Sequence, residues 1–539
     1  MVERDGSDLI AELSSGYSFE GPSIHLGAAV LDGEVYPEVA VRLPLAMMNR
    51  HGLVAGATGT GKTITLQVMA EQLSAQGVPV FLADIKGDLT GLSTPGSGGE
   101  KLLARTQSVG QQWTARSFPV EYLSLGGQGV GVPIRATISA FGPLLLSRVM
   151  DLNDTQESSL TLIFHYADLA GLELFNLADL RAVISFLTSD DGKSALKDLG
   201  GLSKATAGVI LRELITLEAQ DMARFFGEPE FNTADLLRQA PDGRGMISCL
   251  ELPTLLQTPQ LFSTFLMWLV ADLFADLPEV GDQDKPKLVF FLDEAHLLFD
   301  DASKEFLRSI QTTVRLIRSK GVGIFFVTQT PKDVPPDVLG QLANRVQHAL
   351  RAFTPDDAKA LKATVSTFPT SDYDLAEVLT SAGTGEAVVT VMNERGAPTP
   401  VAWTRMTSPE STMGPSAPAV VEDIVRASPL RAHYESAVDS HSAFEQLATS
   451  PPPNAVPPPE STADAEARRI EESITGHRGT PQPSPGPART PPPLGVPLPA
   501  PRQQDSELME FAVKAAGAIG AELARGLFGT QRRRSRRRW

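Results

Sequence analysis

From residue 56 the chain reads Gly56-Ala57-Thr58-Gly59-Thr60-Gly61-Lys62-Thr63, which fits the phosphate-loop pattern G-x-x-x-x-G-K-[ST]. The three glycines let backbone N–H groups turn inward and approach phosphate oxygens, because no Cβ stands in the way. A helix that begins at the end of the loop would direct the positive end of its dipole at the same anion. All eight residues are therefore predicted to contact a nucleoside triphosphate.

The residues on either side of the loop support this prediction. Residues 51–55 are mostly apolar and short enough for a buried strand. Within the loop, Lys62 is predicted to reach the β- and γ-phosphates, and Thr63 to give its hydroxyl to Mg²⁺. The helix after the loop has apolar residues with helical spacing, namely Ile64, Leu66, Val68, Met69 and Leu73.

A second informative run is the apolar segment 288–292, which ends in Asp293 and Glu294. Such a run predicts a strand buried on both faces, with its acids at the carboxyl edge of a parallel sheet, where ligands bind. Asp293 is then predicted to hold Mg²⁺, and Glu294 to act as the general base that polarises the attacking water. Taken alone, the two acids would also fit an ordinary strand end.

Two further residues are weaker candidates for the catalytic site. Gln329 follows the apolar strand-like run 323–328 and fits a sensor of the γ-phosphate, although a simple strand cap fits as well. Arg345 begins another strand-like segment and is the preferred arginine finger, which would contact the γ-phosphate of a neighbouring subunit. A stripe formed by Arg308, Arg315 and Arg318 fits a subunit contact, a DNA contact or a solvated helix face.

Composition places further limits on the protein. With 539 residues and 42% apolar content, the chain is long enough for about two domains and a tail. Its single cysteine, Cys249, lies in an apolar run and is expected to pack rather than react, which favours a reducing, cytoplasmic location. The sequence indicates no secretion signal or membrane span.

The charge is distributed unevenly along the chain. The net charge is −17, and the residues from Pro409 onward hold 15 acidic and 15 basic side chains, so the whole excess lies before them. An acidic body argues against a protein coated with nucleic acid on its outer surface, but it allows a local basic channel.

Pattern changes along the chain suggest six segments. Residues 1–50 are expected to form a short β element, and 51–142 the first part of the nucleotide-binding core. Residues 143–240 have mostly helical patterns and read as an insertion, while 241–408 complete the core. Residues 409–504 are predicted to be a disordered linker, because 16 prolines lie between 451 and 502; residues 505–539 follow as an amphipathic helix and an arginine-rich end.

The last segment has features of an interaction site. Residues 505–528 have helical apolar periodicity, which fits docking on a partner, on the body of the protein or on a membrane surface. Six arginines occupy the seven positions 532–538 and would bind anions such as DNA, RNA or acidic lipid. A tail that only keeps the protein soluble is the plainer alternative.

Five ordered blocks together resemble the HerA-like ATPases of the HerA/FtsK superfamily, in particular the family with a helicase HerA-like C-terminal domain. The blocks span residues 49–63, 84–91, 291–299, 315–321 and 340–354, within a resemblance that covers about 20–406. The resemblance implies an α/β, RecA-like P-loop NTPase fold of the additional-strand, catalytic-glutamate type. It also implies ATP and Mg²⁺ as cofactors, a homo-oligomer that is expected to be a hexameric ring, and DNA as the partner.

The resemblance also has limits. No clear counterpart of the longer N-terminal barrel of archaeal HerA is visible, and the proline-rich tail is expected to lie outside the shared domain. The run Asp293-Glu294-Ala295-His296 fits a DEAH-box RNA helicase too, but that class needs a second RecA-like lobe, for which too few residues follow Thr354.

The sequence therefore predicts an ATP-hydrolysing motor that moves along DNA or remodels it, as a helicase or translocase. The alternative is an ATP-dependent switch or scaffold that acts on a protein partner through the C-terminal tail.

Overall fold

The computed structural model describes residues 6–196, 200–252, 259–299 and 304–449. These residues form a single 12-stranded sheet in the order β2-β1-β12-β11-β10-β3-β9-β8-β4-β7-β5-β6. The strands are β1 (Ser23–Leu31), β2 (Glu34–Pro44), β3 (Gly52–Ala55), β4 (Val80–Asp84), β5 (Val120–Leu125), β6 (Val132–Ile134), β7 (Ile247–Glu251), β8 (Leu288–Leu292), β9 (Val322–Thr328), β10 (Asn344–His348), β11 (Glu386–Thr390) and β12 (Ala402–Met406).

The sheet has an antiparallel part and a parallel part. Neighbouring strands from β2 to β10 in the sheet order pair antiparallel, and those from β10 to β6 pair parallel. β9 lies between β3, which leads into the phosphate loop, and β8, which leads into Asp293. This is the additional strand that the resemblance implied, and it confirms the predicted RecA-like α/β class.

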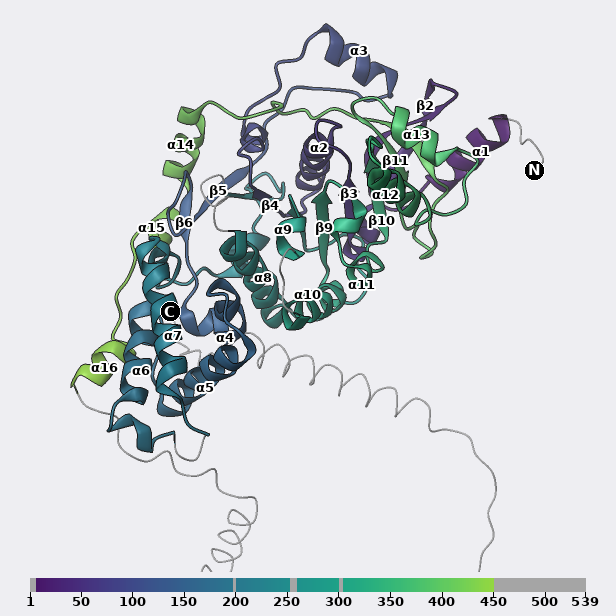
Figure 1. Cartoon of the computed structure of the whole chain (residues 1–539). Coiled ribbons are helices and arrows are strands. Elements are labelled where there is room, and N and C mark those ends of the chain that lie inside the picture. Colours follow the sequence, from purple (N-terminus) through teal and green to yellow (C-terminus); the bar gives the residue numbers. More distant parts are fainter. Residues whose placement is uncertain (1–5, 197–199, 253–258, 300–303, 450–539) are drawn as a thin grey trace, which may run out of the picture.

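The longer helices lie on the two faces of the sheet or beyond its β6 edge (Figure 1). They are α1 (Gly6–Gly16), α2 (Lys62–Ala75), α3 (Glu100–Ser108), α4 (Ile138–Val149), α5 (Asp154–Ala170), α6 (Leu177–Thr188), α7 (Lys204–Ala219), α8 (Pro259–Asp276), α10 (Lys304–Ile317), α12 (Pro355–Val365), α13 (Leu375–Ser381), α14 (Pro418–Ala427) and α16 (Ala443–Thr449). Three single-turn helices complete the set: α9 (His296–Phe299), α11 (Pro336–Leu339) and α15 (Arg431–Tyr434).

Alternating residues of the central strands divide the interior into two cores. Leu53 of β3 belongs to a core with the apolar faces of α4–α8 and α10, whereas Val54 belongs to the core that contains α1 and α2. This division follows from strand geometry, because successive side chains point to opposite faces. Helices α4–α7 lie beyond the β6 edge of the sheet (Figure 1). They fall largely within residues 143–240, for which the sequence predicted helices.

The structure corrects two expectations about the ends of the folded region. The segment before residue 50 contains α1 as well as a hairpin, and β1 pairs with β12 to join the main sheet. The prediction of a disordered linker from residue 409 is wrong for 409–449, where the chain forms α14, α15 and α16. α16 packs against α6, and the hydroxyl of Ser442, directly before α16, donates to the buried Asp179 carboxylate of α6, a partner too distant in sequence to predict.

The proline-rich run 451–502, the helix expected at 505–528 and the arginine cluster lie outside the described residues. Among the described helices, none is both long and apolar enough to cross a membrane.

Candidate nucleotide site

The phosphate loop joins β3 to α2 at the carboxyl edge of the parallel strands, as predicted. It is held from both sides of β3: the Gly56 N–H donates to the Thr328 carbonyl at the end of β9 (3.3 Å), and the Ala57 N–H donates to the Ala349 carbonyl just after β10 (2.9 Å). Thr60 is fixed by its hydroxyl, which donates to the Ala57 carbonyl (2.7 Å). The loop therefore has a set shape with Thr58 and Gly59 exposed at its tip.

Two glycines of the loop are required by the geometry. At Gly56, a Cβ would lie 2.5 Å from the Cβ of His348. At Gly61, which directly precedes α2, the backbone angle φ is +118°. Residues other than glycine rarely adopt such a left-handed value. A side chain at either position would therefore force the loop or its neighbours to shift.

Lys62 is buried at the first position of α2, and its Nζ donates to the carbonyls of Gly56 (2.7 Å) and Ala57 (3.2 Å). Burial lowers the pKa of Lys62, against the opposing effect of Glu294 and Asp293. Thr63 follows at the next position and is half-buried. Both residues lie where the motif predicted them.

Asp293 and Glu294 follow β8 directly. Asp293 is 3% exposed, and its Oδ1 accepts a hydrogen bond from the Glu294 N–H (2.9 Å), while its Oδ2 is buried and accepts none from the described residues. Burial, together with the charge of Glu294, raises the pKa of Asp293 to about 6, although Lys86 acts in the opposite direction. A buried carboxylate oxygen without a donor is a suitable ligand for a hard cation such as Mg²⁺, so the residues present fit the predicted metal.

Glu294 lies next to this carboxylate in an uncommon backbone conformation. Its φ is +45°, which places a residue other than glycine in the left-handed region. Lys86 Nζ lies 2.6 Å from its Oε1, and His296 Nδ1 lies 3.4 Å from its Oε2. The predicted base and the predicted metal ligand are therefore brought together at the end of one strand.

The two weaker candidates stay predictions. Gln329 is exposed and follows Thr328, whose carbonyl accepts from the phosphate loop, so its backbone lies beside the site. Arg345 lies near the start of β10, and its guanidinium donates to the carbonyls of Leu339, Leu342 and Thr367. These contacts give Arg345 a structural role within its own subunit, in addition to the predicted role as a finger.

Sequence reasoning assigned no role to several residues that shape the site. His348 is fully buried between Thr65 Oγ1 (2.9 Å from Nε2) and the Glu386 carbonyl (2.9 Å from Nδ1), and burial lowers its pKa to about 4, so its ring is neutral. The Gly385 N–H donates to the Thr60 carbonyl (2.9 Å). No local pattern could have revealed partners that lie some 300 residues from the loop.

Cys249 is fully buried in β7, as expected of a packing residue. Its Sγ lies 3.5 Å from Glu251 Oε1, and a ligand atom of Asp84 is within 4.8 Å of both. Burial and the charge of Asp84 raise the pKa of Glu251 to about 8, so this acid is mostly protonated at neutral pH.

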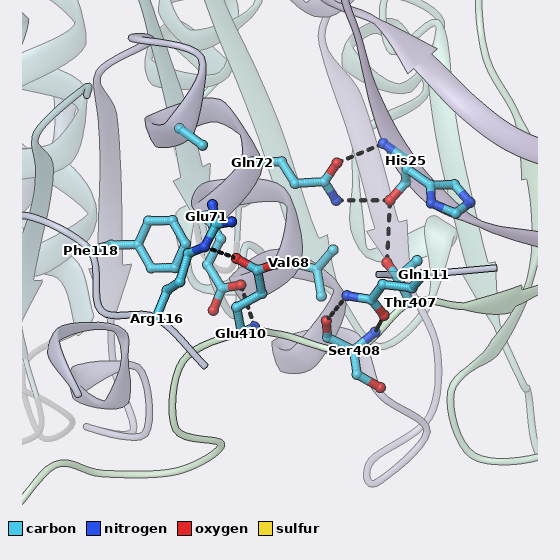
Figure 2. Close-up of a pocket in the computed structure, with 11 residues that line it drawn as sticks. His25, Val68, Glu71, Gln72, Gln111, Arg116, Phe118, Thr407, Ser408 and Glu410 are labelled. Atoms are coloured by element: carbon cyan, nitrogen blue, oxygen red, sulfur yellow. Dashed lines mark hydrogen bonds and ion pairs between the residues drawn. The ribbon is translucent and has the colours of Figure 1, made fainter. Parts of the chain in front are cut away.

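A second polar region lies along α2, away from the phosphate loop (Figure 2). It surrounds a cavity of about 210 Å³ lined by residues of α2, the segment 111–118 and the chain just after β12. Glu71 is 3% exposed here and accepts hydrogen bonds from the N–H groups of Glu410 (2.7 Å) and Ser411 (3.1 Å), and from the Ser411 hydroxyl. We call residues 407–412 the strap.

The arrangement of β3, loop, α2, β8 and the inserted β9 defines a P-loop nucleotide-binding protein with a RecA-like sheet. The chain belongs to the helicase HerA-like C-terminal family, whose model matches residues 31–537. The match runs past residue 406, so the expectation that the shared region ends there is wrong.

Individual relatives are more distant. The chain is 23% identical over 384 residues to the DNA double-strand break repair helicase HerA of Saccharolobus solfataricus, covering 70% of this chain and 68% of that protein. Among solved structures, the plasmid coupling protein TrwB in complex with ADPNP is 17% identical with a TM-score of 0.49, covering 75% of this chain and 99% of that one. VirB4 of Thermoanaerobacter pseudethanolicus is 15% identical with a TM-score of 0.42, covering 74% and 98%.

Proposed function

We propose that this protein hydrolyses ATP with Mg²⁺ and uses the energy to move along, or remodel, DNA. The observation that carries the ATPase half is the juxtaposition of a complete phosphate loop with a buried carboxylate oxygen, Asp293 Oδ2, that has no donor among the described residues. An orphaned buried carboxylate oxygen costs stability unless a ligand satisfies it, which favours a metal at this edge of the sheet.

In this proposal the loop N–H groups and Lys62 bind the phosphates, while Thr63 and Asp293 hold the metal. Mg²⁺ supplies neutralisation of the phosphate charge. Glu294 accepts the proton of a water that attacks the γ-phosphorus; the new P–O bond forms as the bond to the β-phosphate oxygen breaks, leaving ADP and phosphate. Gln329 is proposed to sense the γ-phosphate from its place after β9.

The DNA half of the proposal is supported by family membership and by the exposed arginines of the α10 region. Phe306, Ile310, Val314 and Ile317 of this region face the core, whereas Arg308, Arg315 and Arg318 are exposed. The relative from Saccharolobus solfataricus is named a DNA helicase. We infer that copies of this chain assemble into a ring, with Arg345 as a candidate finger, and that a basic stripe on an otherwise acidic body contacts the DNA backbone.

Steady-state ATP hydrolysis, with and without double-stranded and single-stranded DNA at two salt concentrations, tests this function. Lys62→Ala serves as the blank. Stimulation by DNA that weakens at the higher salt and vanishes in the blank is expected of a DNA motor. Turnover that is indifferent to DNA would contradict the motor and favour the switch on a protein partner, and turnover equal to the blank would contradict the ATPase.

A further inference from the structure

The loop after β4 presents Lys86 to the candidate nucleotide site from a fixed backbone. The Asp84 carboxylate accepts hydrogen bonds from three N–H groups of this loop: Lys86 (3.2 Å), Gly87 (2.7 Å) and Leu89 (2.9 Å). Three such bonds to one buried carboxylate close the loop into a single shape. The ammonium group of Lys86 is therefore delivered from a rigid support, although its side chain is 45% exposed.

The two oxygens of the Glu294 carboxylate differ in their surroundings. Oε1 lies 2.6 Å from Lys86 Nζ. Oε2 is buried and accepts no hydrogen bond from the described residues, and His296 Nδ1 stands 3.4 Å away. One oxygen is thus paired with a cation, while the other is enclosed beside His296 and has no hydrogen-bond donor among the described residues.

This pairing also keeps the carboxylate away from the phosphate-binding lysine. Glu294 acts on the pKa of Lys62 through its charge, so the two groups lie within electrostatic range. A glutamate side chain has three rotatable bonds, and without a partner it would be free to turn toward Lys62 or toward solvent. An ammonium group at 2.6 Å restricts this rotation before the substrate arrives.

We propose that Lys86 is a positioning residue for the ATPase site: it binds Oε1 of Glu294 and so holds the carboxylate in place before the attacking water arrives. The inference rests on the proposed function, since it assigns Glu294 as the base. Lys86 itself touches neither the water nor the phosphorus. Its effect should appear in the rate of the chemical step and leave ATP binding unchanged.

The test compares Lys86→Met, Lys86→Arg and wild-type protein in steady-state ATP hydrolysis. Methionine keeps the length of the side chain without the charge, and we expect kcat to fall roughly tenfold or more with KM changed less than about twofold. Arginine retains a charged donor and should recover most of the loss. Lys359→Ala is the control, because Lys359 is 80% exposed and pairs with an exposed aspartate, Asp356.

A double-mutant cycle separates positioning from a general structural effect. If Lys86 acts through Glu294, the double variant Lys86→Met/Glu294→Gln should be no slower than Glu294→Gln alone. A multiplied loss in the double variant, or a raised KM with unchanged kcat in Lys86→Met, would overturn the inference. If wild-type turnover itself equals that of Lys62→Ala, the proposed function fails; if wild type turns over and Lys86→Met matches it, only the role of Lys86 fails.

Discussion

Helix α2 supports two polar sites that are built on opposite principles. At its first turn, Lys62 faces a region where buried oxygens such as Asp293 Oδ2 lack donors. Nine residues later, Glu71 is buried as deeply as Asp293, since each is 3% exposed. Both oxygens of Glu71, however, accept hydrogen bonds from the strap. Buried polar groups left open indicate a place for a ligand, whereas satisfied ones indicate structure. Substitutions at the first site should therefore affect turnover, and those at the second should affect stability.

The largest effect is expected for Glu294→Gln. Loss of the proposed base should reduce kcat by about 100-fold or more, with ATP still bound, because an amide cannot accept the proton of water. The midpoint of thermal unfolding should change little, because Oε2 accepts no hydrogen bond from the described residues and Lys86, the partner of Oε1, is 45% exposed. Hydrolysis and melting of the same preparation check this, with the exposed Glu100→Gln as control. Full turnover in Glu294→Gln would remove the assignment of the base.

The reverse outcome is expected for Glu71→Ala. The N–H groups of Glu410 and Ser411 would lose their acceptor, and unsatisfied groups in such positions cost about 1–3 kcal/mol each. We expect the free energy of unfolding to fall by about 3 kcal/mol at pH 6, measured by urea titration, with kcat of the folded protein within about twofold of wild type. An exposed control is Glu38→Ala in β2. A large loss of kcat without loss of stability would erase the contrast between the two sites.

The contrast also explains what the sequence could predict. The phosphate loop, Asp293 and Glu294 were found because each lies in a short run whose pattern is set locally, by a strand end or a tight loop. The additional strand β9 came from the resemblance, which a HerA-like family match now supports. These elements place three neighbouring strands of the parallel part, β3, β9 and β8.

The strap was missed for a physical reason. Residues 407–412 have no regular secondary structure, so neither helical nor strand periodicity marks them. They are held by side chains such as Glu71 and Gln111, about 300 residues earlier in the chain. The pairing of Lys86 with Glu294 was missed in the same way: the block 84–91 was visible in the sequence, but its partner was not.

The pH dependence of stability sharpens the comparison further. Burial raises the pKa of Glu71 from 4.5 to about 7, with the hydrogen bonds from Ser411 and Glu410 opposing it. The folded state then holds a proton that the unfolded state releases, so stability is greatest below about pH 4.5 and is lost as the pH rises to about 7. From pH 5 to pH 8 this carboxyl should cost about 2.5 kcal/mol. Relative to Glu71→Gln, wild type should lose that amount; parallel pH profiles would contradict the shift.

The smallest effect on stability is expected at Gln111, whose side-chain amide binds both the N–H and the carbonyl of Ser408 in the strap. Its Nε2 donates to the Ser408 carbonyl (2.7 Å), and its Oε1 accepts from the Ser408 N–H (2.9 Å). Gln111→Ala should cost about 1 kcal/mol. Because Gln111 and Glu71 hold the same segment, the double variant should lose less than the sum of the single losses.

Gln239 provides the control for this coupling, because its side-chain amide also donates to a backbone carbonyl, that of Gly77 (2.6 Å), which lies outside the strap. Gln239→Ala combined with Gln111→Ala should therefore be additive within about 0.5 kcal/mol. Additivity there, together with coupling between Gln111 and Glu71, would show that the strap docks as one unit. If Glu71 and Gln111 are additive too, each contact forms by itself, and α2 carries separate hydrogen bonds rather than a second organised site.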